Sequence, residues 1–104
     1  MRMLREIMIP PAVKAIKDNT FYHCSRLTTV NLGEGLEEIG EGAFGECTSL
    51  NEISIPPAVK AIIDEAFARC SQLTIVTLGK GLDEIGVAAF FECTSLHELS
   101  IPPC

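Results

Sequence analysis

Cysteine is the reactive residue whose spacing first suggests chemistry in this chain of 104 residues. Four of the five cysteines recur every 23 residues, namely Cys24, Cys47, Cys70 and Cys93. A row of thiols could bind a metal or form a redox device, but zinc sites usually take paired thiolates close in sequence, and each interval here supplies one. Free cysteine is also a small, readily buried hydrophobic residue, so we expect four buried thiols and no metal site. Cys104 falls outside this register, and we expect it to be exposed.

The remaining reactive residues do not predict a catalytic group. His23 and His97 occupy different positions within the 23-residue interval, so they are not expected to converge on a cysteine or serine nucleophile. The glycine-rich segments 33–35 and 79–81 are too short for a phosphate-binding loop and follow no strand-to-long-helix pattern. We therefore expect turn glycines, no catalytic residue and no cofactor.

One row of charged residues could form a binding site or could simply reinforce the fold. The residues at this shared position alternate in sign: Lys14, Glu37, Lys60 and Asp83. We expect each base to face an acid one interval away, and solvent-facing pairs of this kind stabilise a sheet by about 0.2–1 kcal/mol. Glu38 and Glu84 add acidity that could attract a cation or a basic partner.

The same 23-residue interval governs the apolar residues, and this decides the fold. Three apolar columns recur without interruption: Phe21, Phe44, Phe67 and Phe90; Ile16, Ile39, Ile62 and Ile85; Leu27, Leu50, Leu73 and Leu96. We divide the chain into a partial repeat at 1–9, repeats at 10–32, 33–55, 56–78 and 79–101, and a tail at 102–104. A fixed period of this length is the signature of a solenoid. The chain is therefore expected to be one elongated repeat domain.

A longer period of 46 residues divides the repeats into two alternating types. The segment Pro10–Ile16 recurs unchanged at Pro56–Ile62, and Gly33–Gly40 returns with small changes at Gly79–Gly86. Duplication of a two-repeat unit would leave this pattern, and so would deliberate construction.

Each repeat contains segments that predict its local structure. In Leu27–Leu32, apolar residues alternate with polar ones, which is typical of a strand with one buried face. Val13–Ile16 predicts a second extended piece. Asp64–Cys70 begins with acids and has a base near its end, which favours one or two turns of helix. One coil cannot bury these apolar side chains alone, so the coils must stack and pair their strands into a parallel sheet.

The repeat pattern V-x-x-I-x-x-x-A-F-x-x-C-x-x-L-x-x-[IV]-x-[IL]-[PG] resembles the BspA-type, or Treponema-type, leucine-rich repeat over essentially the whole chain. This resemblance implies an α/β solenoid of about 4.5 coils, curved so that a short parallel β-sheet lies on the concave side. Short helical turns would lie on the convex side. It also implies binding as the usual role, because proteins of this type often act as surface adhesins.

Charge and hydropathy exclude several classes of partner. The formal net charge of −6 argues against nucleic-acid binding, which needs a basic surface to displace counterions from phosphates. Residues 1–26 hold five basic and two acidic side chains, whereas the remainder holds three basic and twelve acidic ones. No apolar stretch approaches the roughly 20 residues that cross a bilayer. The first ten residues interleave charges with apolar side chains, unlike a secretory signal, so a cytoplasmic location is favoured.

The outward positions of the predicted sheet form the candidate binding surface. They are small, polar and varied, and none is aromatic: Glu6, Met8, Thr29, Asn31, Glu52, Ser54, Ile75, Thr77, Glu98 and Ser100. An open sheet face of this kind is where solenoids commonly hold ligands. A solvated face without a ligand is the alternative interpretation.

Two functions follow, and neither is enzymatic. The first is a protein-interaction scaffold that binds another protein through the concave sheet face. The second is a structural or self-assembling unit, because Leu4, Ile7, Leu96 and Leu99 lie in end rungs that lack a polar cap. The basic start and acidic remainder would favour head-to-tail contact between copies. We therefore expect a protein partner or a homo-oligomer, and no nucleic-acid or membrane partner.

Overall fold

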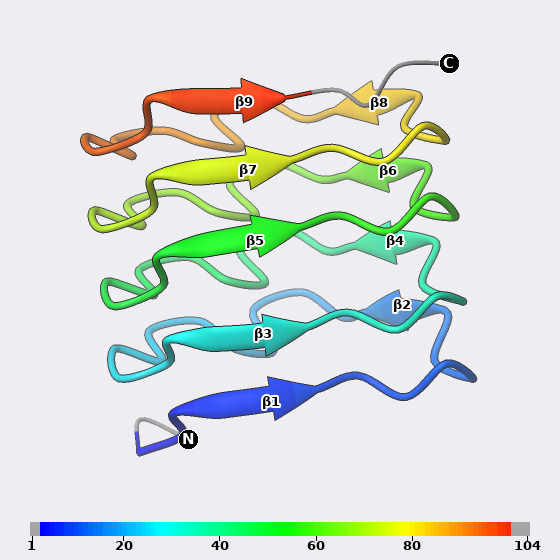
Figure 1. The fold of residues 1–104 in the computed structure, drawn as a ribbon, viewed down its shortest axis with the longest axis horizontal. Coiled ribbons are helices and arrows are strands. Elements are labelled where there is room, and N and C mark those ends of the chain that lie inside the picture. Colours follow the sequence, from blue (N-terminus) through cyan, green and yellow to red (C-terminus); the bar gives the residue numbers. More distant parts are fainter. Residues whose placement is uncertain (1–2, 101–104) are drawn as a thin grey trace.

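Each 23-residue repeat forms one coil, and the coils stack into a β-solenoid of about four turns (Figure 1). This computed structural model describes residues 3–100. One layer, which we call the long-strand layer, contains the three-residue strands: β1 (Glu6–Met8), β3 (Thr29–Asn31), β5 (Glu52–Ser54), β7 (Ile75–Thr77) and β9 (Glu98–Ser100). The opposite short-strand layer contains the two-residue strands: β2 (Ala15–Ile16), β4 (Glu38–Ile39), β6 (Ala61–Ile62) and β8 (Glu84–Ile85). Both extended pieces of the predicted repeat are therefore strands.

Strand pairing confirms that successive coils lie in register. Ile39 lies opposite Ile16 on one side and Ile62 on the other, and Ile62 lies opposite Ile85. All of these pairs are parallel, and each joins residues 23 positions apart. Alternate residues of a strand point to opposite faces of the sheet, so the isoleucines face inward while their neighbours, such as Glu38, face solvent.

The core consists of columns of like side chains. The rings of Phe21, Phe44, Phe67 and Phe90 stack in sequence, with centroid separations of 5.3, 5.3 and 5.5 Å. Leu27, Leu50 and Leu73 are fully buried beside them. Since the coils share one interior, each coil buries an apolar surface that it could not bury alone.

The helical turns predicted on the convex side are wrong, because residues 3–100 contain strands and turns but no helix. The segment following each short strand turns twice through the left-handed backbone region. In repeat 10–32 these residues are Asn19 and His23, with φ of 59° and 62°, and in repeat 56–78 they are Glu65 and Arg69. A residue of this conformation every fourth position interrupts a right-handed helix before it completes a turn.

Hydrogen bonding gives the physical reason for these turns. The backbone N–H groups of Phe21, Phe44 and Phe67 donate to the carbonyls of the next coil, at 2.8, 2.7 and 2.8 Å. The intervening N–H groups close tight turns, as Cys24 does on the carbonyl of Phe21 at 3.2 Å. Because the donors are satisfied between coils and within tight turns, no i to i−4 ladder forms.

The long-strand layer is not one continuous sheet. β1 pairs with β3, and β5 pairs with β7 and β9, but β3 and β5 belong to different sheets. At the other junctions, the residue that follows a strand donates a backbone hydrogen bond to the neighbouring strand. Ile9 N–H donates to the carbonyl of Asn31, and Ile55 N–H donates to the carbonyl of Thr77, both at 2.8 Å. Within the described residues, Leu32 N–H makes no equivalent bond to Ser54. The short-strand layer is continuous, so it holds the coils together across the break.

The turn glycines are required by close approach between coils. A Cβ on Gly33 would lie 2.5 Å from the carbonyl oxygen of Ile9, and one on Gly79 would lie 2.5 Å from that of Pro56. Any larger residue would push the coils apart at these two positions. Residues 34–35 and 80–81 form turns, as predicted. Over residues 3–100 there is no helix long and apolar enough to cross a membrane.

Candidate binding surface

The ten residues of the candidate binding surface lie together on the long-strand layer, two on each strand. Glu6 lies beside Thr29, and Met8 lies beside Asn31. On the other side of the break, the outward positions of β5, β7 and β9 align in two rows: Glu52, Ile75 and Glu98, then Ser54, Thr77 and Ser100. Between the two outward residues of β1, β3, β5 and β7, an apolar residue such as Val30 or Val76 points into the core.

The exposure of these ten residues varies along the layer. Ile75, Thr77 and Ser100 are half-buried, whereas the outward residues of β1, β3 and β5 are exposed. Met8 is 74% exposed and is the largest apolar side chain of the set. Side chains on the first three long strands are therefore the most accessible to a partner.

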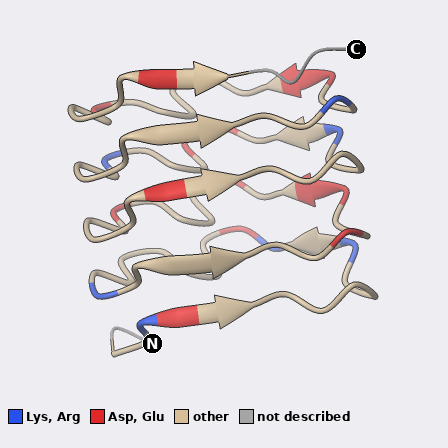
Figure 2. Ribbon diagram, viewed as in Figure 1, with Lys and Arg blue, Asp and Glu red and all other residues tan. Residues whose placement is uncertain are grey.

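The surface is acidic at every second strand. Glu6, Glu52 and Glu98 occupy equivalent positions on β1, β5 and β9, while β3 and β7 carry no charge (Figure 2). No lysine or arginine lies within the five long strands. This charge distribution favours a basic partner over an acidic one.

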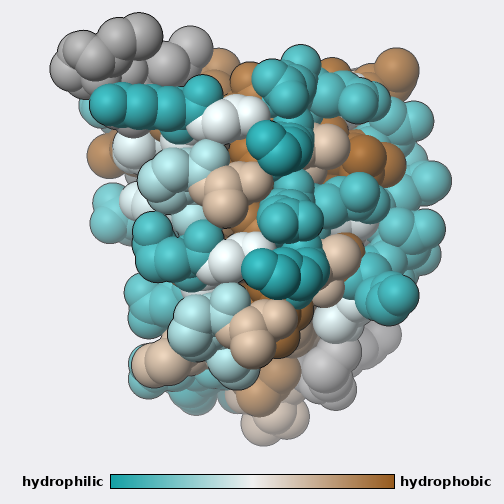
Figure 3. Space-filling view, turned by 90° about the vertical axis from the view of Figure 1, so that its right-hand side faces the viewer, coloured by the Kyte–Doolittle hydropathy of each residue, from teal (hydrophilic) through white to brown (hydrophobic). Residues whose placement is uncertain are grey.

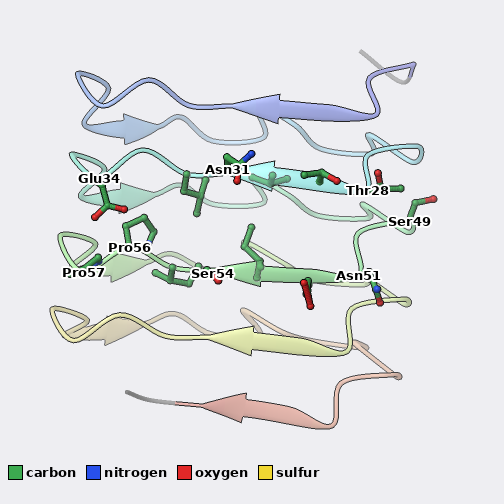
Figure 4. A pocket seen from close by; sticks show the side chains of 14 residues that line it. Thr28, Asn31, Glu34, Ser49, Asn51, Ser54, Pro56 and Pro57 are labelled. Carbon is green, nitrogen blue, oxygen red and sulfur yellow. The ribbon is translucent and has the colours of Figure 1, made fainter. Parts of the chain in front are cut away.

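A groove of about 770 Å³ lies where the sheet is interrupted between β3 and β5 (Figure 4). Four of the ten predicted residues line it: Thr29, Asn31, Glu52 and Ser54. Polar side chains beyond the strands complete it, with Glu34 at one end and Ser49 and Asn51 at the other. We call this feature the β3–β5 groove.

Sequence reasoning missed the residues at the ends of the groove. Glu34 was interpreted only as part of a glycine turn, and Asn51 lies just before the predicted outward positions of its strand. The 23-residue period offered a signal for Asn51, which shares its position with the polar residue Thr28. It offered none for the groove itself, because every coil has the same pattern.

The row that begins with Lys14 lies on adjacent coils, as predicted, but forms no ion pairs. Glu37 N–H donates to the carbonyl of Lys14 at 2.7 Å, and Lys60 N–H donates to that of Glu37 at 2.8 Å. Among the residues that the structure describes, no salt bridge joins these side chains. Figure 3 views the molecule from the side toward which the long strands run, where hydrophilic residues form bands between paler ones.

Among the described residues, the ion pairs join Arg69 to Glu46 and Glu92, and these residues lie instead on the turns, at the left-handed positions. Glu46 contacts His23 Nδ1 at 3.3 Å and Arg69 Nη1 at 3.8 Å, and Arg69 Nε reaches Glu92 at 3.0 Å. Tyr22 Oη also donates to Glu46 at 3.0 Å, and this hydrogen bond raises the pKa of Tyr22. These contacts are solvent-exposed, so we interpret them as reinforcement of the stack rather than as a reactive site.

The cysteine column is a structural feature of the interior. Cys24, Cys47 and Cys70 are buried and Cys93 is half-buried, which confirms most of the prediction. Three of these thiols donate to a phenylalanine carbonyl of the preceding coil, at 3.1–3.3 Å. Burial raises the pKa of Cys47 to about 12. No group of three or more potential metal ligands occurs in residues 3–100, and Cys104 lies outside the described residues.

Solved structures share this fold. A leucine-rich repeat protein from Bacteroides ovatus is 34% identical with a TM-score of 0.88, and 92% of this chain covers 24% of that one. The T. pallidum leucine-rich repeat protein is 33% identical with a TM-score of 0.89, and 91% of this chain covers 44% of it. A leucine-rich cell surface protein from Faecalibacterium prausnitzii is 24% identical with a TM-score of 0.81, and 96% of this chain covers 32% of it.

The chain therefore spans less than half the length of these similar proteins. The curated proteins contain no significant match to it. The family described as BspA-type leucine-rich repeat region matches residues 2–103, with a model of six copies of the repeat. This match covers nearly every residue, and the coils stack in register as the repeat requires. The chain therefore belongs to the BspA-type leucine-rich repeat family.

Proposed function

We propose that the long-strand layer is a protein-binding surface and that the chain is a non-enzymatic interaction scaffold. The observation that supports this most is the contrast between the two faces of the long strands. Inward residues stay aliphatic in every coil, whereas the outward ones include acids, hydroxyls, an amide, a methionine and an isoleucine. Packing in the core explains why the inward residues stay the same. The outward residues are not restricted by packing, so they are free to specify a partner.

The fold also favours this role. Leucine-rich repeats suit interaction or scaffold functions, and their stacked strands offer an open surface rather than an enclosed reaction site. In this chain the β3–β5 groove adds a concave region to that surface. We expect the bound protein to be basic where it meets Glu6, Glu52 and Glu98.

Affinity capture from a cell extract tests this function. Glu52→Lys and Glu98→Lys together reverse the charge of β5 and β9, and we expect proteins captured by the wild-type chain to be lost. The matched control is Glu37→Lys together with Glu84→Lys, which makes the same charge change away from the long-strand layer. Capture that survives the first pair of substitutions would refute binding through this layer.

Self-association is a second candidate, supported by apolar side chains on the last coil. Ile85 is 45% exposed, whereas its equivalents Ile39 and Ile62 are fully buried, and Leu99 on β9 is 51% exposed. A second copy that packed against this coil would cover both residues. We propose that copies associate through these end surfaces, because burying apolar area drives association.

Light scattering over a range of protein concentrations tests the second candidate. We expect the average mass to rise with concentration, and Ile85→Lys together with Leu99→Lys to keep the chain monomeric. A wild-type chain that remains monomeric throughout would exclude self-association.

A further inference from the structure

We propose that the β3–β5 groove binds an extended peptide segment that carries two basic residues four positions apart. This inference rests on the proposed protein-binding function and identifies the part of the surface and the chemistry of the partner. It is supported by the interrupted sheet, the polar lining of the groove and the placement of two carboxylates.

The interrupted sheet leaves backbone groups without a partner in the neighbouring strand. Elsewhere in the long-strand layer, Thr28 N–H donates to Arg5 and Thr74 N–H donates to Asn51, both at 2.8 Å. Across the groove, the described residues show no bond from Asn51 N–H to Thr28, or from Leu32 N–H to Ser54. Backbone donors and acceptors must be satisfied by water or by a ligand. Because β3 and β5 remain neighbours across the interruption, an extended peptide would lie along the outward face of the groove, where it offers both kinds of group along its length.

The lining provides hydrogen-bonding side chains from both strands. Thr29 and Asn31 line the groove from β3, and Ser54 lines it from β5. Hydroxyls and amides can donate to and accept from a peptide backbone without requiring a particular side chain. The volume of about 770 Å³ lies within the usual range of ligand sites. Neutral contacts along the floor would therefore hold the backbone of a peptide in many sequence contexts.

Two carboxylates give the groove its selectivity. Glu52 is the first residue of β5, and Glu34 lies at the far end of the groove, where the chain turns (Figure 4). Glu52 is equivalent to Thr29, so the two positions differ by five residues, and because Glu34 lies in a turn beyond β3 this corresponds to at most about 16 Å. No basic residue lines the groove. An extended peptide with basic residues at positions i and i+4 would place both side chains on one face, about 13 Å apart, and their length can span the remainder.

A nine-residue probe peptide tests the proposal. It is fluorescently labelled, has lysines at its third and seventh positions, and otherwise contains serine and threonine. One control peptide has adjacent lysines at its third and fourth positions, and another has glutamates in place of both lysines. We expect the wild-type chain to bind the first peptide saturably in fluorescence anisotropy at low salt, about fivefold more tightly than the adjacent-lysine peptide, and not to bind the glutamate peptide.

Variants of the chain locate the binding. We expect Glu34→Gln and Glu52→Gln each to weaken binding of the spaced-lysine peptide about fivefold, because each removes one charged contact. Glu37→Gln, at an exposed position outside the groove and outside the long-strand layer, is the matched control and should leave binding unchanged. Circular dichroism verifies that all three variants remain folded.

Each contrary outcome overturns the groove assignment and leaves the proposed function to its own test. These outcomes are an absence of saturable binding, equal affinity for both lysine spacings, and a loss that follows Glu37→Gln but not Glu34→Gln. Oligomers of the wild-type chain that Glu34→Gln separates would assign the groove to a second copy instead. The capture experiment with β5 and β9 reversed in charge decides the scaffold function independently of the probe.

Discussion

At the scale of single residues, the interior depends on repetition of the same side chain at the same position. Phe44 and Phe67 each stack on a phenylalanine above and below, and no atom of either is exposed. Cys47 and Cys70 occupy the space beside them and donate to backbone carbonyls of the preceding coil. These columns followed directly from the 23-residue spacing, because a residue type repeated at one position of every coil must form a row when the coils stack.

We expect Phe67→Ala to lower the free energy of unfolding by about 3–5 kcal/mol, because it opens a cavity in a column that has neighbours on both sides. Phe91→Ala is the matched control, since Phe91 is 45% exposed, and its effect should remain below about 1 kcal/mol. Denaturant unfolding monitored by circular dichroism measures both. Equal losses in the two variants would contradict the column.

Stability should also depend on pH through the buried thiols. Burial raises the pKa of Cys47 from its usual value of 9.0 to about 12, and it also raises that of Cys24. Above pH 9 the unfolded chain loses thiol protons that the folded chain keeps, so stability is full below pH 9 and is lost as the pH rises toward 12.

The matched variant for this dependence is Cys47→Ser, whose hydroxyl can still donate to Phe21 but does not titrate in this range. We expect its unfolding free energy to fall less steeply than that of the wild-type chain when both are measured between pH 8 and pH 11. Parallel curves for the two chains would show that the Cys47 thiol does not contribute.

At the scale of elements, the strands could be predicted from the sequence and the convex turns could not. Alternating apolar residues around Val30 specify a strand, and the structure forms one there. The segment Asp64–Cys70 has a composition that suits a helix, but its backbone N–H groups donate alternately to the next coil and within tight turns of the same coil. Among the described residues in the left-handed region, Gly42 is a glycine and Asn19 is an asparagine, both types that favour this conformation. Repeats 56–78 and 79–101 have neither type there and gave no residue signal for the turn.

A glycine substitution distinguishes the turn from a helix. Glu65 is exposed and has a φ of 57°, a conformation that costs an L-residue about 1–2 kcal/mol and costs glycine nothing. We expect Glu65→Gly to leave stability unchanged or to raise it by up to about 1 kcal/mol, whereas the same change within a helix would lower it by about 1 kcal/mol.

The control for this prediction is Glu41→Gly, at an exposed position without a positive φ. It should lower the free energy of unfolding by about 0.5–1 kcal/mol, because glycine adds freedom to the unfolded chain and relieves no strain. Thermal and denaturant unfolding provide the measurement. A clear loss of stability in Glu65→Gly would argue for a helical segment.

At the scale of the whole molecule, the two strand layers have different roles: the short-strand layer keeps the coils in register, and the long-strand layer carries the groove. The short-strand layer pairs through all four of its strands, which keeps the coils in one stack. The long-strand layer is interrupted between β3 and β5, and this interruption creates the groove. The ten outward residues were predictable because alternation fixes which side chains leave the sheet. The interruption was not predictable, since the sequence pattern of Thr29–Asn31 and Glu52–Ser54 matches that of strands that do pair.

Stacking in register underlies every part of this account, and contacts between phenylalanine rings test it most directly. In a Phe91→Leu chain with protonated phenylalanine rings in a deuterated background, nuclear Overhauser spectroscopy should report the four column residues alone. The centroid separations of 5.3–5.5 Å predict cross-peaks for Phe21 with Phe44, Phe44 with Phe67, and Phe67 with Phe90. Cross-peaks between Phe21 and Phe90, or none between neighbours, would contradict a stack of coils in register.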